Sequence, residues 1–155
     1  MTSCLKIAGG LPKCIILTER KPLPQLEKLL KFHLAQPEGL NLITGYGADY
    51  VTVNGARHSA GSLLVAPDSI IENWVVASFN ALNENHFAAM LVLKPELVLL
   101  GTGSKLQFPH PRLSACLTNA GIGMEVMDTG AACRTYNILV AEGRRAVVGL
   151  LFNPA

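Results

Sequence analysis

A glycine pair followed by a serine and a lysine gives one stretch of this sequence the composition of an anion-binding loop. Gly101-Thr102-Gly103 is followed directly by Ser104 and Lys105. Glycines let a backbone approach a phosphate closely, and serine and lysine side chains bind anions. The full nucleotide-binding fingerprints are absent, because Leu106 stands where GxGxxG requires its third glycine and no GxxxxGK[ST] occurs. We therefore favour a structural turn over a phosphate site.

A second group of polar residues surrounds the predicted start of a helix. Asp128 or Thr129 is expected to cap this helix, and Arg134 falls within its first two turns. The positive end of a helix dipole disfavours a cation unless an anion lies near. We favour an internal ion pair with Glu125, and a bound anionic ligand or an acidic partner surface is the alternative. Asn137 is expected to cap, to bridge two segments or to bind, and the sequence does not choose among these.

Nucleophilic and metal-dependent chemistry have less support. No GxSxG elbow occurs, and four histidines lie far apart without HxxxH or HExxH spacing: His33, His58, His86 and His110. Cys133 lies one turn into the predicted helix but adjoins the apolar stripe of Ala132 and Tyr136. We interpret Cys133 as a small buried hydrophobe and Tyr136 as a core residue with a hydrogen-bonded hydroxyl. The sequence predicts no catalytic residue, no metal site and no cofactor.

The composition fits one folded domain without a strong electrostatic field. The chain has 155 residues, of which 50% are hydrophobic and 15% charged, so a disordered chain is excluded. The net charge of +2 gives nucleic-acid binding little support, and no apolar run approaches the roughly 20 residues that span a bilayer. Four cysteines without CxxC pairing suit free thiols in a reducing compartment: Cys4, Cys14, Cys116 and Cys133. We expect a cytoplasmic protein, or a mitochondrial matrix protein if the source is a eukaryote.

These candidate residues need strands and helices to position them. Glycines and prolines interrupt residues 1–31, which we interpret as an amino-terminal extension before a single domain at 32–155. Short β-type runs follow at 40–44 and 50–53, and the Asn54-Gly55 pair after them predicts a hairpin turn of type I′. The front of the domain is therefore expected to contribute a β-hairpin portion.

The rest of the chain alternates between strand and helix patterns. Further strands are expected at 62–66, 74–79, 96–100, 122–127 and 146–152. Helices are expected at 84–93, at 111–120, and from Asp128 or Thr129 to about Glu142. This alternation predicts an α/β fold whose open sheet is at least partly parallel.

Several of these stretches together resemble one protein family. Gly101-Thr102-Gly103 is followed in order by Met127-Asp128-Thr129, Arg134-Thr135-Tyr136-Asn137 and Glu142-Gly143-Arg144. In this order the motifs resemble the respiratory complex I assembly factor three family, whose prokaryotic members are largely uncharacterised. The resemblance implies a single three-layer α/β domain with a central mixed β-sheet flanked by helices. It also implies a role in assembly and not in electron transfer. A single Arg20 among the first 30 residues favours a prokaryotic member, because it offers no arginine-rich targeting segment.

Two hypotheses of function follow. The favoured one is a non-catalytic interaction module that binds protein partners during assembly of a membrane complex, through an apolar patch or through the loops after Gly101 and Asp128. The alternative is a binding protein or enzyme that holds an anionic small molecule in a crevice between 101–105 and 128–134. The candidate ligand- or partner-binding residues are the same for both: Gly101, Thr102, Gly103, Ser104, Asp128, Thr129, Arg134 and Asn137. An exposed apolar patch favours the first hypothesis, whereas a concave pocket with convergent polar groups favours the second.

Overall fold

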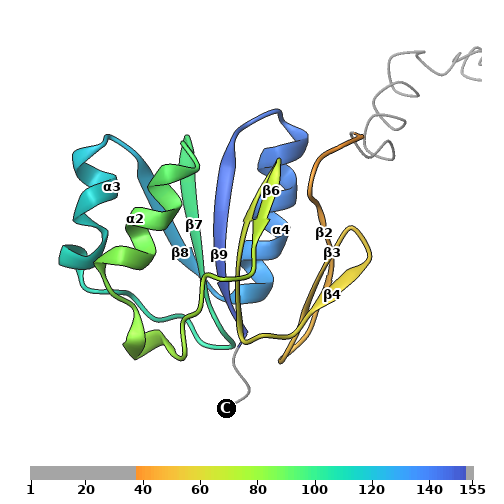
Figure 1. The fold of residues 1–155 in the computed structure, drawn as a ribbon, viewed down its shortest axis with the longest axis horizontal. Coiled ribbons are helices and arrows are strands. Elements are labelled where there is room, and N and C mark those ends of the chain that lie inside the picture. Colours follow the sequence, from red (N-terminus) through yellow and green to blue (C-terminus); the bar gives the residue numbers. More distant parts are fainter. Residues whose placement is uncertain (1–37, 153–155) are drawn as a thin grey trace, which may run out of the picture. The chain divides into compact units, whose positions relative to one another are not determined.

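The computed structural model describes residues 38–152, which form an α/β fold with two β-sheets (Figure 1). The predicted extension at 1–31 lies outside the described residues. The larger sheet has five strands in the order β6-β5-β9-β7-β8, and the smaller has three in the order β2-β3-β4. No helix within residues 38–152 is long and apolar enough to cross a membrane.

The elements have the following bounds. The small sheet contains β2 (Ile43–Tyr46), β3 (Val51–Val53) and β4 (Ala56–His58). The large sheet contains β5 (Ser62–Ala66), β6 (Ser69–Ile71), β7 (Leu97–Thr102), β8 (Gly123–Met127) and β9 (Ala146–Leu151). The helices are α2 (Glu84–Val92), α3 (Ala115–Asn119) and α4 (Thr129–Ala141), with 3₁₀ turns at η3 (Phe79–Ala81) and η4 (Pro111–Ser114).

The large sheet is mixed, as predicted. β7 pairs in parallel with β8 and with β9, whereas β5 pairs antiparallel with β6 and with β9. Because β7, β8 and β9 run in one direction, their carboxyl ends meet at the same edge of the sheet. The loops predicted to bind a ligand or partner begin at this edge.

The large sheet is the middle one of three layers (Figure 1). α4 and the small sheet cover one face, and α2 and α3 cover the other. Alternate side chains of the central strands enter the two cores: Leu99 and Val148 pack on the α4 side, whereas Val98 and Val147 pack on the α2 side. All four are completely buried, as expected for strands covered on both faces. The three-layer α/β architecture implied by the family resemblance is confirmed.

The hairpin between β3 and β4 forms where the sequence predicts it. Asn54 and Gly55 have φ angles of +50° and +88°, which a type I′ turn requires. Val53 pairs with Ala56 directly across the turn. The Asn54 side chain also accepts a hydrogen bond of 2.9 Å from the Leu42 N–H. The same residue therefore holds the backbone just before β2 against the turn.

The predicted strand at 74–79 is wrong. β5 already has β6 and β9 as its two neighbours, so no ladder position beside it remains for a further strand. The Ser62 hydroxyl instead donates to the Trp74 carbonyl (2.8 Å) and accepts from the Val76 N–H (3.0 Å), and so satisfies the irregular segment. Trp74 and Val76 are still buried, which produces the apolar alternation that resembled a strand.

Two helices begin where the sequence predicts them, but a third is shorter than predicted. α2 begins at a capping box between Asn83 and His86, and α4 begins at Asp128, whose carboxylate accepts the Ala131 N–H at 2.8 Å. The helix predicted at 111–120 is divided into the 3₁₀ turn η4 and the short α3. α4 is the longest of the described helices, and it carries the second group of candidate residues.

Candidate functional site

The two loops predicted to share a crevice lie against each other. The Gly103 N–H donates to the Thr129 hydroxyl and the Gly103 carbonyl accepts from the Thr129 N–H, each at 2.9 Å. The same hydroxyl donates to the Leu151 carbonyl at 2.5 Å, at the end of β9. Thr129 is buried and joins the carboxyl ends of two strands to the first turn of α4.

This junction uses the groups that an anion would need. The Gly103 N–H already has the Thr129 hydroxyl as its acceptor, and the first turn of α4 already has the Asp128 carboxylate. A bound phosphate would therefore compete with one internal hydrogen bond and meet one negative charge. The geometry agrees with the structural turn that the sequence analysis favoured for Gly101–Lys105.

Gly101 allows α4 to approach β7 closely. A side chain there would begin 3.1 Å from the Ala132 Cβ and 3.0 Å from the Leu150 Cδ2. Contacts this short force neighbouring groups to move, so the absence of a side chain sets the distance between helix and strand. Gly101 is buried, and its role is in packing.

Thr102 folds the loop that leaves β7. Its buried hydroxyl donates to the Lys105 carbonyl at 2.7 Å and accepts from the Gln107 N–H at 3.1 Å. A single side chain thus closes the turn around Ser104, which is itself exposed. The loop is held by its base and projects from the carboxyl edge of the sheet.

The side chains that this loop exposes are apolar. Leu106 is 52% exposed and Phe108 is 72% exposed, although both belong to residue types that usually lie inside. Lys105 precedes them and His110 and Arg112 follow, all exposed. Sequence reasoning used Leu106 only as the residue that breaks a glycine fingerprint, so it missed this surface.

The predicted ion pair between Arg134 and Glu125 is wrong. The Arg134 Nη1 donates to the Tyr46 hydroxyl at 2.5 Å, and Glu125 is exposed on the edge strand β8. Gly130 leaves room for this contact, because a Cβ there would lie 3.0 Å from the Tyr46 ring. Arg134 is exposed and its guanidinium has no carboxylate partner among residues 38–152.

Asn137 bridges two segments, one of the three roles left open by the sequence. Its amide accepts from the Ile43 N–H at 2.9 Å and donates to the Ile43 carbonyl at 2.7 Å. The Asn137 side chain thereby forms with the Ile43 backbone of β2 the two hydrogen bonds that a neighbouring strand would form. The buried Tyr136 next to it donates to the Asn41 carbonyl at 3.0 Å, which confirms the predicted core role with a satisfied hydroxyl.

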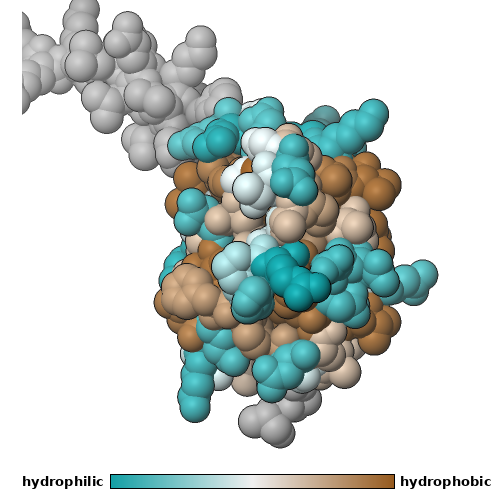
Figure 2. Space-filling model, turned by 90° about the vertical axis from the view of Figure 1, so that its left-hand side faces the viewer, coloured by the Kyte–Doolittle hydropathy of each residue, from teal (hydrophilic) through white to brown (hydrophobic). Residues whose placement is uncertain are grey.

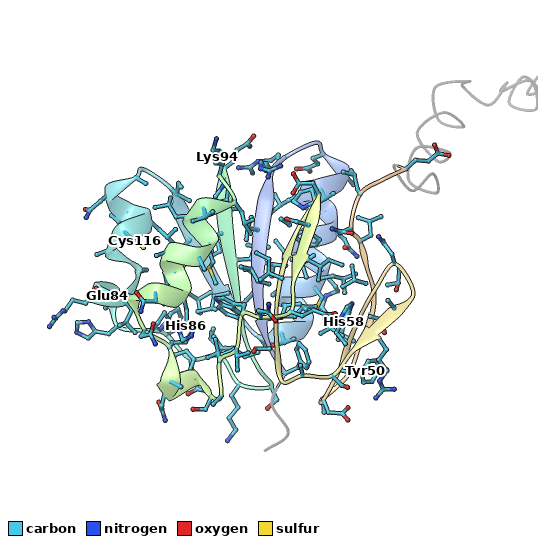
Figure 3. The ribbon with its side chains drawn as sticks, in the orientation of Figure 1. Tyr50, His58, Glu84, His86, Lys94 and Cys116 are labelled. Carbon is cyan, nitrogen blue, oxygen red and sulfur yellow. The ribbon has the colours of Figure 1, made fainter. Side chains whose placement is uncertain are left out.

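Cys133 is buried, as predicted. Desolvation by burial is the main cause that raises the pKa of its thiol to about 12, and the nearby Arg134 charge opposes this only partly. A thiol with such a pKa is almost wholly protonated at neutral pH and is a poor nucleophile. Within the described part of the chain, no three metal-ligating side chains lie together, and His58 and His86 lie well apart (Figure 3).

Sequence reasoning missed one further contact between the two sheets. His58 on β4 and Glu72 after β6 form a pair, with 2.8 Å between the His58 Nδ1 and the Glu72 Oε1. Two open hollows of about 460 and 310 Å³ flank this pair, and the His58 Nε2 is buried without a partner in the described structure. The two residues lie 14 positions apart and fit no motif, so only the folded chain brings them together.

Curated relatives of this chain bear the name of an assembly factor. The chain is 33% identical over 114 residues to the mouse protein named NADH dehydrogenase [ubiquinone] 1 alpha subcomplex assembly factor 3, and 32% identical to its human counterpart. The mouse match covers 72% of this chain and 60% of the relative. The chain therefore spans about 60% of the length of the curated relatives it matches, and the resemblance to this family is confirmed.

Solved bacterial structures share the fold. A protein from Bordetella parapertussis is 39% identical, with a TM-score of 0.69 over 75% of this chain and 98% of its own. A Mth938-like domain from Bordetella pertussis is 32% identical, with a TM-score of 0.69 over 78% and 92% of the two chains. A family model described as a protein of unknown function (DUF498/DUF598) matches residues 43–151, and the chain belongs to that family.

Proposed function

We propose that this chain is a non-catalytic protein-binding module that assists the assembly of a membrane-bound respiratory complex. Relatives named as complex I assembly factors support this function, and they support it for the α/β domain, which the sequence predicts at 32–155. We place the activity in the cytoplasm, or in the mitochondrial matrix of a eukaryotic source. The partners on this proposal are proteins of the complex or of its assembly path.

The observation that carries the proposal is the exposed apolar pair on the loop after β7. Leu106 and Phe108 extend from a turn that Thr102 holds by two hydrogen bonds. Exposing large apolar side chains on a fixed backbone costs solvation and brings the fold itself no packing. Such side chains are typical of the centre of a protein interface, where a partner covers them.

The polar candidates support an enzyme or small-molecule site less well. Gly103, Thr129 and Asn137 form hydrogen bonds within the fold, and the Asp128 carboxylate caps α4. Arg134 is exposed and donates to the Tyr46 hydroxyl. Convergent unpaired polar groups are what a ligand site needs, and this region offers few of them.

The test is affinity capture of the tagged full chain from its source cells in mild detergent, with co-purifying proteins identified by mass spectrometry. The double variant Leu106→Ser, Phe108→Ser removes the apolar pair. We expect it to lose respiratory-complex subunits or assembly proteins that the native chain retains, by roughly tenfold or more, as for loss of a central interface side chain. Val92→Ser on α2 is the matched control, because Val92 is 77% exposed but lies before β7, at the opposite end of that strand.

A second variant tests whether the contact extends to α4. Arg134→Ala removes an exposed cation whose described partner is the Tyr46 hydroxyl. Retained capture confines the contact to the loop, and lost capture extends it across the first turns of α4. If the native chain enriches no respiratory or assembly protein, or if the loop variant captures the same proteins equally well, the proposed function is wrong.

A further inference from the structure

We propose that the loop after β7 receives an acidic segment of another protein, one that carries apolar side chains between its carboxylates. This inference rests on the proposed function and names the chemistry of its partner. The surface consists of Leu106 and Phe108 together with the flanking bases Lys105, His110 and Arg112, and we call it the apolar-basic loop.

The charged side chains of the apolar-basic loop itself are all basic. No aspartate or glutamate occurs from Leu97 to Met124, so the loop and the helix after it contribute no carboxylate of their own. Neither Lys105 nor Arg112 takes part in an ion pair within residues 38–152. Two neighbouring elements carry a carboxylate: Glu84 lies in the first turn of α2, which contacts η4, and Asp128 precedes Thr129, which hydrogen-bonds to Gly103. Two cations beside an apolar pair are complementary to carboxylates beside apolar side chains.

The loop backbone is ordered before any partner arrives. Thr102 fixes its first half by hydrogen bonds to Lys105 and Gln107. In its second half, the His110 Nδ1 accepts from the Arg112 N–H at 3.2 Å and caps η4, whose first residue is Pro111. Proline fixes φ and so reduces the freedom that binding would remove. A pre-ordered surface of this kind favours a specific contact with a protein segment.

A membrane surface fits these residues less well than an acidic protein segment. Segments that bind anionic lipid by charge carry about four to eight Lys and Arg residues. The apolar-basic loop carries two, Lys105 and Arg112. Two cations give little attraction to a membrane at physiological salt, whereas a protein carboxylate can approach each of them individually.

Other exposed apolar side chains do not form a comparable pair. The remaining large ones are isolated along the described chain: Tyr46, Val75, Val92 and Ile138. Hydrophobic and hydrophilic groups are interspersed on the face that Figure 2 shows, and no broad apolar area dominates it. Leu106 and Phe108 are separated by one residue, a spacing that a short partner segment can cover.

The test is selection of a random peptide display library against the immobilised full chain, followed by sequencing of the enriched peptides. We expect enriched peptides with Asp or Glu next to Leu, Ile or Phe. Their binding should weaken about threefold to tenfold in the double variant Lys105→Glu, Arg112→Glu. It should weaken by a similar factor when the salt is raised from 50 to about 300 mM, because charges at an interface rim act through screened attraction. Lys94→Glu is the matched control, since Lys94 precedes β7 and lies at the opposite end of that strand (Figure 3).

The outcomes separate this inference from the proposed function. Neutral or basic enriched peptides, or equal weakening by Lys94→Glu, would overturn the acidic partner, and capture of respiratory proteins through Phe108 would still stand. Sedimentation with phosphatidylglycerol vesicles that is lost in Lys105→Glu, Arg112→Glu, without enrichment of acidic peptides, would replace the protein segment by a lipid surface. Enrichment of the same acidic peptides by the double variant Leu106→Ser, Phe108→Ser would remove the apolar pair from the contact.

Discussion

The first turns of α4 and the loop after β7 lie against each other, yet they differ in how their side chains are used. In α4, Thr129 and Asn137 direct their polar atoms into hydrogen bonds within the domain. In the loop, the side chains of Thr102 and His110 form such hydrogen bonds, while Leu106 and Phe108 remain exposed. Both stretches contain residues that the family resemblance and the glycine pattern brought to attention, but the exposed apolar pair lies on the loop.

This difference separates residues that specify a fold from residues available for function. A buried hydroxyl or amide with two partners is costly to replace, because each partner loses its hydrogen bond in a place that water does not reach. An exposed apolar side chain is cheap to replace for the fold and costly only for an interface. Changes at the buried residues of α4 should therefore affect the fold far more than changes at the exposed residues of the loop.

The reactivity of Cys133 should show the most pronounced difference. Because burial raises its pKa to about 12 from the ordinary 9.0, its thiolate fraction at pH 8 falls by about a thousandfold. In the native protein, iodoacetamide should modify Cys133 at least about a thousandfold more slowly than an ordinary exposed thiol. Peptide mapping by mass spectrometry reads each cysteine separately, and the half-buried Cys116 is the internal reference. Equal modification rates for the two thiols would show that the first turns of α4 are accessible to the reagent, and would contradict the burial of Cys133.

Thr129→Val should be the most destabilising conservative change in the junction. The substitution keeps the shape of the side chain but leaves the Gly103 N–H and the Leu151 carbonyl without their partner. Two buried unsatisfied groups cost about 3 kcal/mol in the free energy of unfolding, measured by urea denaturation. Thr118→Val, at an exposed position of α3, should cost less than about 0.5 kcal/mol. If Thr129→Val costs no more free energy of unfolding than Thr118→Val does, the junction is open to water.

Asn137→Ala should have an intermediate effect. It removes both hydrogen bonds between α4 and Ile43 of β2, at a cost of about 2 kcal/mol. Asn85→Ala, in the exposed first turn of α2, is the matched control and should change the free energy of unfolding by less than about 0.5 kcal/mol. Hydrogen exchange of the Ile43 amide gives an independent measurement, because this amide should lose its protection in Asn137→Ala alone.

The elements that sequence reasoning placed well are those whose local signals agree with their tertiary setting. Asn54-Gly55 dictates its own turn, and the apolar run before Gly101 matches the doubly covered β7. The segment at 74–79 failed because Trp74 and Val76 are buried by contacts that the local pattern cannot distinguish from a sheet. Whether a ladder position was free depended on the pairing of β5 with β6 and β9, which is not a local property.

The candidate site divides in the same way. The meeting of Gly103 and Thr129 followed from the rule that parallel strands end at one edge. The partner of Arg134 could not be inferred, because Tyr46 lies 88 residues away and Glu125 was closer in sequence. The exposure of Leu106 and Phe108 was also out of reach, since apolar residues are expected inside unless the fold leaves them uncovered.

The smallest effect on stability should come from the residues proposed to matter most for binding. Leu106→Ser and Phe108→Ser should each change the free energy of unfolding by less than about 0.5 kcal/mol, because both side chains are more than half exposed. Val92→Ser should behave alike and thus calibrates an exposed apolar change. A loss above about 1 kcal/mol for Phe108→Ser alone would show that its ring packs on the domain. Loss of capture by that variant would then report a damaged fold and could no longer be assigned to a lost contact. A native-like unfolding curve together with lost capture would instead confirm that the loop binds a partner, whereas the adjacent first turns of α4 stabilise the fold.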